Sequence, residues 1–135
     1  MAIYAVGANY HWGDVSQDFI DNGIVATGWD GSTAPDIHEM FRDINVGDIV
    51  YIKSCNFSSN ITVKAIGIVR DDFILSSLDE PDLIEIGRNI RWIYTDCFVI
   101  TRPANQKNNV RGNTIYREYH PEIISTIMSI VNKTI

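Results

Sequence analysis

The stretch Ile49–Arg70, which reads IVYIKSCNFSSNITVKAIGIVR, contains two runs rich in β-branched residues. The runs are Ile49–Ser54 and Ile61–Arg70, and the segment between them is polar except for Phe57. This pattern predicts a β-hairpin. Because the second run is apolar on both alternating faces around Gly67, we expect that strand to be buried on both sides or bulged.

Toward the N-terminus, short strands and helices alternate. The predicted elements are strands at 2–7 and 24–28, a loop at 9–13 and helices at 14–23 and 33–43. The first helix should end at Asn22 and Gly23, since glycine accepts the left-handed conformation that closes many helices. Thr33 and Asp36 have the spacing of a capping box, which predicts the start of the second helix.

Toward the C-terminus, the pattern is again mostly β. The predicted elements are a continuation of the hairpin strand at 73–75, an acidic surface loop at 79–82, one bent strand or two within 90–101, a polar loop at 103–109 and a short strand at 113–116. The segment 120–122, His-Pro-Glu, opens a final helix, because proline suits the first turn. In that helix Ile123, Ile127 and Ile130 share an apolar side that must pack on the sheet.

Length and element order predict one α+β domain that covers residues 1–135. A chain of 135 residues can bury a core without disulfides or metals. Helices interspersed irregularly among strands favour a curled mixed β-sheet or partial barrel over a parallel βαβ array. No apolar run approaches the roughly 18 residues that span a bilayer, and the N-terminus lacks the basic region of a signal peptide. We therefore expect a cytoplasmic protein with no membrane partner.

The charge of the chain is unevenly distributed. The formal net charge of −6 opposes binding to phosphate. However, residues 1–87 hold fourteen acids and four bases, whereas residues 88–135 hold seven bases and three acids. We expect Arg88, Arg91 and Arg111 in this basic part to contact phosphates, and a solvated charged surface is the alternative.

The sequence contains none of the common catalytic or cofactor motifs. His11, His38 and His120 are scattered, with no spacing typical of metal ligands. A P-loop, a nucleophile elbow and a dinucleotide fingerprint are all missing. We therefore expect no catalytic residue, no metal site and no cofactor.

The order of several short motifs resembles a known family. The motifs are Phe19, Asn22-Gly23-Ile24, Ala26-Thr27-Gly28-Trp29-Asp30, Val46-Gly47-Asp48-Ile49-Val50, Ala65-Ile66-Gly67-Ile68-Val69 and Ile90-Arg91-Trp92-Ile93. Their order resembles the PUA-like superfamily in its EVE-like and McrB-N-terminal-like branch, to which the YTH readers are related. The resemblance implies a curled, barrel-like sheet flanked by helices, and an aromatic-lined pocket that holds a modified base of nucleic acid.

The resemblance also assigns candidate site residues. It implies that the mouth of the pocket is formed by Asn9, Tyr10, His11 and Trp12. Val25, followed by Ala26, stands where YTH readers carry a cage tryptophan, so the modification recognised stays unassigned. Trp29 is either an alternative aromatic wall or a core residue. Ser54 and Phe57, near the predicted hairpin tip, are candidates for contact with a base or another subunit.

These observations predict a non-catalytic binding module for a modified or flipped base in DNA or RNA. The resemblance implies a role in restriction or defence, alone or with a partner effector protein. A protein-interaction or small-ligand module of the same fold is the alternative, favoured by the acidic first part and the missing cage aromatic. A third reading is an ASCH-like nucleoside amidohydrolase, in which Lys53 or Lys64 pairs with an acid such as Asp30.

Overall fold

The centre of the protein is a curled mixed β-sheet, seen in a computed structural model that describes residues 1–54, 60–102 and 113–135. Six strands follow in the order β4-β7-β6-β5-β1-β9, and β8 pairs with the beginning of β6. The strands are β1 (Ile3–Gly7), β4 (Ile24–Thr27), β5 (Ile49–Ser54), β6 (Ile61–Ser76), β7 (Ile86–Tyr94), β8 (Phe98–Ile100) and β9 (Ile115–Arg117). β1 and β5 are parallel, and the other pairs of the sheet are antiparallel.

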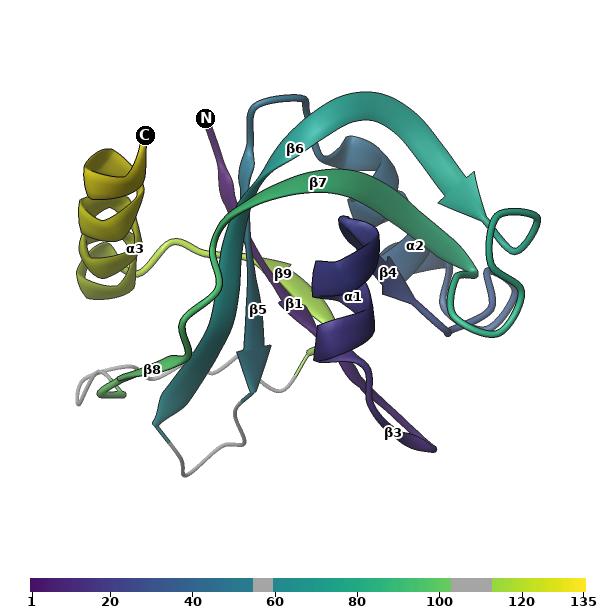
Figure 1. Cartoon of the computed structure of the whole chain (residues 1–135). Coiled ribbons are helices and arrows are strands. Elements are labelled where there is room, and N and C mark those ends of the chain that lie inside the picture. Colours follow the sequence, from purple (N-terminus) through teal and green to yellow (C-terminus); the bar gives the residue numbers. More distant parts are fainter. Residues whose placement is uncertain (55–59, 103–112) are drawn as a thin grey trace.

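Three helices cover the two faces of the sheet among the described residues: α1 (Ser16–Asn22), α2 (Pro35–Asp43) and α3 (Pro121–Thr134). Figure 1 shows β6 and β7 arching together over α1, while α3 stands on the other side of the sheet. Alternate residues of the central strands enter two separate hydrophobic clusters. Val50 packs with Phe19 of α1 and Phe41 of α2, whereas Tyr51 packs with Ile127 of α3. The predicted α+β class and curled sheet are confirmed.

The curl of the sheet comes from irregular pairing between β6 and β7. The register shifts between Ile66 and Gly67 and again between Val69 and Ile74. Extra residues on one strand bend it and increase its twist. Gly67 is required at the first shift, because an added Cβ would lie 2.7 Å from Cε3 of Trp92. The prediction that this strand is bulged is therefore confirmed, and the strand continues through 73–75 as expected.

Two local predictions were wrong. The segment 9–13 does not remain a loop, because β2 (Asn9–Tyr10) and β3 (Gly13–Asp14) form a small antiparallel hairpin. The capping box is not formed either, since Ala34 occupies the N-cap of α2 and the Thr33 hydroxyl donates to the carbonyl of Asp30 instead.

The other helix ends and the C-terminal strands follow their predictions closely. Gly23 closes α1 in the left-handed conformation, with φ of 64°. Residues 90–101 contribute to two strands, β7 and β8, and α3 buries Ile123 and Ile127 with Val131 rather than Ile130. None of the described helices has the length and apolar character needed to cross a bilayer.

Candidate ligand pocket

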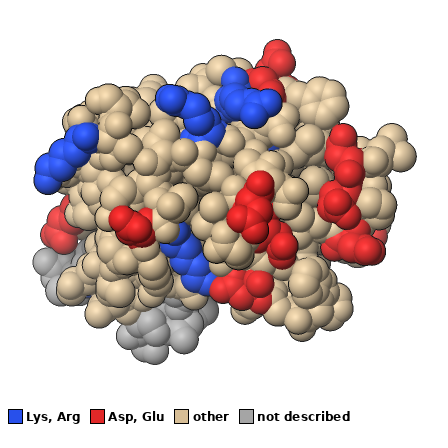
Figure 2. All heavy atoms as spheres, in the orientation of Figure 1, with Lys and Arg blue, Asp and Glu red and all other residues tan. Residues whose placement is uncertain are grey.

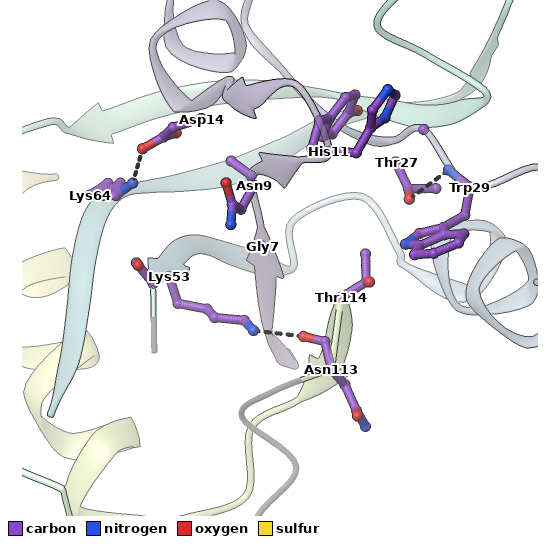
Figure 3. A pocket seen from close by; sticks show the side chains of 14 residues that line it. Gly7, Asn9, His11, Asp14, Thr27, Trp29, Lys53, Lys64, Asn113 and Thr114 are labelled. Carbon is purple, nitrogen blue, oxygen red and sulfur yellow. Dashed lines mark hydrogen bonds and ion pairs between the residues drawn. The ribbon is translucent and has the colours of Figure 1, made fainter. Parts of the chain in front are cut away.

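A pocket of about 560 Å³ opens where β1 and β5 end side by side (Figure 3). Its volume lies in the range of small-ligand sites, roughly 300–1,000 Å³. The lining residues come from six segments: Gly7 and Ala8 at the end of β1, Asn9, Tyr10, His11 and Asp14 of the β2–β3 hairpin, Thr27, Gly28 and Trp29 at the end of β4, Lys53 and Ser54 of β5, Lys64 of β6, and Asn113 and Thr114 before β9. The parallel pair thus gathers residues from distant parts of the chain at one edge of the sheet.

Tyr10 forms a fixed aromatic wall of this pocket. Its hydroxyl donates to the carbonyl of Leu83 at 2.6 Å, and its ring meets the edge of Phe19 with 6.2 Å between centroids. Gly28 allows the chain to pass close to this ring, because an added Cβ would lie 3.2 Å from Cε2 of Tyr10. Burial raises the pKa of the Tyr10 hydroxyl, which therefore stays protonated as a hydrogen-bond donor.

Trp29 provides a second aromatic group at the rim of the pocket. Its side chain is 57% exposed, which is unusual for an indole. The backbone around it is fixed, since its N–H donates to Oγ1 of Thr27 and its carbonyl accepts from Nε2 of His38 at 2.6 Å. A carbonyl can only accept, so Nε2 of His38 must carry the proton. Trp29 is therefore exposed on a backbone that is held in place, and the core alternative for it was wrong.

Lys53 and Lys64 bring positive charge to the opposite part of the pocket (Figure 3). Nζ of Lys53 donates to the carbonyl of Asn113 at 2.6 Å and lies 5.4 Å from the centroid of the Tyr116 ring. Lys64 stands at a register shift, because Ile52 pairs with Ala65 and Lys53 with Val63. The extra residue at this bulge is thus the second lysine.

Lys64 forms an ion pair with Asp14 of the β2–β3 hairpin. Its Nζ also lies 3.2 Å from Oγ of Ser16, which in turn donates to the Asp14 carboxylate. Burial alone would raise the pKa of Asp14, but the hydrogen bonds from Lys64 and Ser16 lower it below its usual range. The carboxylate is therefore ionised at neutral pH and neutralises part of the lysine charge.

The structure brings together some of the predicted site residues. Those that line the pocket are Asn9, Tyr10, His11, Trp29 and Ser54. Trp12 is also 57% exposed but does not line the pocket, and its ring contacts the edge of Tyr10 from outside, with 5.8 Å between centroids. Phe57 and Arg111 lie outside the described residues.

Val25 and Ala26 do not contact a ligand in this pocket. Both are fully buried in β4, which pairs with β7 and packs into the cluster beneath α1 and α2. A strand buried on both faces offers its side chains no access to solvent. The assignment of these two residues to the site was therefore wrong.

Arg88 does not contact phosphate, because it is only 1% exposed. Its guanidinium donates to the carbonyls of Phe41, Ile44 and Asp71, and therefore serves the fold. Arg91, its neighbour on β7, is exposed but does not line the pocket. Only Arg88 of the predicted phosphate contacts is thus contradicted.

Four polar residues of the lining were not predicted from the sequence, namely Asp14, Thr27, Asn113 and Thr114. Lys53 and Lys64 were predicted only as members of a catalytic pair with an acid such as Asp30. That carboxylate instead accepts from the backbone and hydroxyl of Ser32 and lies outside the lining. The available signal was a lysine within each of two runs rich in β-branched residues.

Comparison with solved structures identifies a similar fold, whereas the two sequence comparisons find no match. No protein-family model matches the sequence, and no curated protein sequence matches it either. A solved structure, the YTH domain of the Zygosaccharomyces rouxii MRB1 protein in complex with N6-methyladenosine RNA, superposes with a TM-score of 0.54. The chain has a YTH-like fold. At 15% identity, the likeness covers 96% of this chain and 85% of that domain, while the EVE-like branch stays a prediction.

Among the described residues, no group of three histidine, cysteine, aspartate or glutamate side chains is placed to hold a metal ion. The chemical groups of the pocket are aromatic rings, amides, hydroxyls, two ammonium groups and the carboxylate of Asp14. Such groups suit non-covalent recognition of a planar, polar ligand.

Proposed function

We propose that this chain binds a modified or flipped base of nucleic acid in the pocket at the end of β1 and β5. The observation that carries the proposal is the exposed Trp29 indole, held beside hydrogen-bonding groups in a concavity of about 560 Å³. The YTH-like fold supports it, because the similar domain was solved with N6-methyladenosine RNA.

The pocket offers the two kinds of contact that an extruded base requires. Stacking on an aromatic side chain contributes roughly 1–3 kcal/mol per base and is insensitive to base identity. Trp29 is the largest exposed ring of the lining and suits this contact. The amide of Asn9 and the hydroxyl of Thr27 line the same space, and an amide both donates and accepts hydrogen bonds to a base edge.

Surface charge favours recognition of a single base over contact with a long phosphate backbone. Figure 2 shows acidic side chains gathered toward the side where the β6–β7 connection lies, while the basic side chains on this face lie in a small group at the top, at the left edge and near the bottom and form no continuous stripe. Backbone contacts by many lysines and arginines make affinity fall steeply with salt. We therefore expect a shallow salt dependence for this protein.

The test compares plain and base-modified oligonucleotides, in DNA and RNA, by fluorescence anisotropy at one low salt concentration. Trp29→Ala should weaken binding by about tenfold to a hundredfold, the loss expected for one stacked base. Trp12→Ala is the matched control, because both indoles are 57% exposed and only Trp29 lines the pocket. Equal effects of the two variants, or no binding to any oligonucleotide, would refute the proposal.

A nucleoside amidohydrolase is a second candidate, favoured by the Lys64–Asp14 ion pair inside the pocket. Incubation with acylated nucleosides, followed by chromatography, tests it directly. Product formation that Lys64→Gln abolishes would support hydrolysis, and no product would remove this candidate.

The proposed cellular setting is cytoplasmic, with recognition in a restriction or defence system and an effector protein as partner. Absorbance at 260 nm of the purified protein and identification of what co-purifies with it test this setting. If another protein co-purifies and nucleic acid does not, the result would favour the alternative of a protein-interaction module.

A further inference from the structure

The charge of the pocket differs from that of the chain. The protein carries a formal charge of −6. The lining of the pocket, in contrast, contains two lysines, Lys53 and Lys64, and one aspartate, Asp14. Two cations against one anion leave an excess positive charge at this place. A concave site lined by one sign of charge attracts ligands of the other sign.

The ammonium group of Lys53 is held in position before any ligand arrives. Lys53 is only 6% exposed, and its side chain crosses the end of β1, where a Cβ added to Gly7 would lie 3.7 Å from Nζ. The bond to the carbonyl of Asn113 and the Tyr116 ring fix the group further. A charge in such a poorly hydrated place acts more strongly on a neighbouring anion than one in water.

Lys64 adds a cation whose strength depends on Asp14. The ion pair between them holds the lysine in the pocket and at the same time offsets its charge. Lys64 is held by this pair and by Ser16, and 25% of its side chain is exposed. An incoming anion therefore meets Lys53 and a partly neutralised Lys64.

The cations and the exposed indole lie in different parts of the same pocket. Figure 3 shows Lys53 and Lys64 on one side and Trp29 on the other, with Asn9, Gly7 and Thr114 between them. A ligand that satisfies both sides has a planar ring at one end and an anionic group at the other. A nucleotide has this form, whereas a nucleoside lacks the anionic group.

We propose that the pocket binds a nucleotide together with its own phosphomonoester, with the base at Trp29 and the phosphate at Lys53 and Lys64. This inference rests on the proposed base recognition and names the ligand class of the same site. The phosphomonoester comes either from a free nucleoside monophosphate or from the phosphorylated end of a strand. The two sources share the chemistry and are separated by the ligands used below.

The first experiment measures affinity by isothermal titration calorimetry for matched pairs of nucleoside and nucleoside 5′-monophosphate. The pairs include the four common ribonucleosides and N6-methyladenosine, and 5′-phosphorylated and 5′-hydroxyl oligonucleotides form a further pair. For at least one base, the phosphorylated ligand should bind about tenfold tighter or more, as charge-assisted contacts imply. A gain for free monophosphates alone identifies a free nucleotide, and a gain for oligonucleotides identifies a strand end.

Three variants of the lining separate charge from shape. Lys53→Met and Lys64→Gln should each reduce the ratio of nucleotide affinity to nucleoside affinity, because each removes a charged contact to the phosphate. Asp14→Asn should increase the gain, because it removes the carboxylate that offsets Lys64. Lys133→Gln on exposed α3 is the control, with the same loss of charge outside the pocket.

The outcomes distinguish this inference from the proposed function. Nucleosides that bind as tightly as their monophosphates would overturn the phosphate site and leave base recognition standing. No binding by nucleosides, nucleotides or oligonucleotides would overturn both. If Lys53→Met fails to fold, the other two variants still test the inference, because Lys64→Gln should lower the gain in affinity from the phosphate and Asp14→Asn should raise it. A change of this gain in the same direction for both variants would overturn the inference.

Discussion

Replacement of Arg88 by methionine should destabilise the protein strongly. The Arg88 side chain reaches from β7 to the end of α2 and to β6, where it donates to the carbonyls of Phe41, Ile44 and Asp71. The last carbonyls of a helix have no partner within the helix, and a bulged strand leaves others unpaired. Arg88 therefore satisfies acceptors that two other elements leave open.

The magnitude follows from these three contacts. Each buried carbonyl that loses its donor costs about 1–3 kcal/mol, whereas relief of the buried charge offsets part of the loss. Burial lowers the pKa of Arg88, and Asp71, Asp72 and Asp48 oppose this change, so the guanidinium stays charged. We expect a net loss of about 3–5 kcal/mol in the free energy of unfolding for Arg88→Met. Arg88→Lys should recover only part of it, because an ammonium lacks the planar fork that reaches separate acceptors.

Urea denaturation followed by tryptophan fluorescence measures this loss. With a slope of about 1–3 kcal/mol/M for a small protein, the midpoint should fall by at least about 1 M. Arg91→Met is the matched control, since Arg91 lies on the same strand and is exposed. A change of less than about 1 kcal/mol for Arg88→Met, the level of many ordinary substitutions, would refute the reasoning.

Three further predictions concern the sheet, the Trp29 loop and the ion pair. Gly67→Ala should cost about 1–3 kcal/mol through overpacking, because the new Cβ would lie 2.7 Å from Cε3 of Trp92, and a similar urea midpoint for variant and parent would contradict this. His38→Ala removes the donor to the Trp29 carbonyl and should weaken nucleoside binding about threefold to tenfold in calorimetry, whereas unchanged affinity would show that other contacts hold the loop. Asp14 has a lowered pKa in the folded state, so its ionised carboxylate stabilises the fold above the ordinary carboxyl pKa. This stabilisation is lost as the pH falls through the pKa of the folded state. Asp14→Asn should therefore be less stable than the parent at pH 7 in urea titrations, and the difference should vanish in strong acid; a constant difference would exclude this linkage.

Local sequence patterns were sufficient to predict most elements of the fold. The β-branched runs of β5 and β6, the stop at Gly23 and the apolar side of α3 each depend on neighbouring residues. The short β2–β3 hairpin was missed because two-residue strands leave too little alternation to detect. Strand order, which makes β1 and β5 parallel neighbours, depends on long-range packing that no local pattern contains.

The errors at the site had signals that were available in the sequence. Arg88 is two residues from both Ile86 and Ile90. Because alternate residues of a strand share one face, this spacing already places Arg88 on the buried face. The uninterrupted apolar run that contains Val25 is typical of a strand covered on both sides. In contrast, the meeting of Lys53, Lys64 and Asp14 follows from pairing between distant segments and becomes visible only in three dimensions.

The single unpaired position that Lys64 occupies opposite β5 links two properties of this protein. Deletion of that residue would restore continuous pairing with β5 and would also remove a cation from the pocket. The pairing of β5 with β6 and the charge of the pocket therefore depend on the same residue. A change that straightened this part of the sheet would also make the pocket less positive.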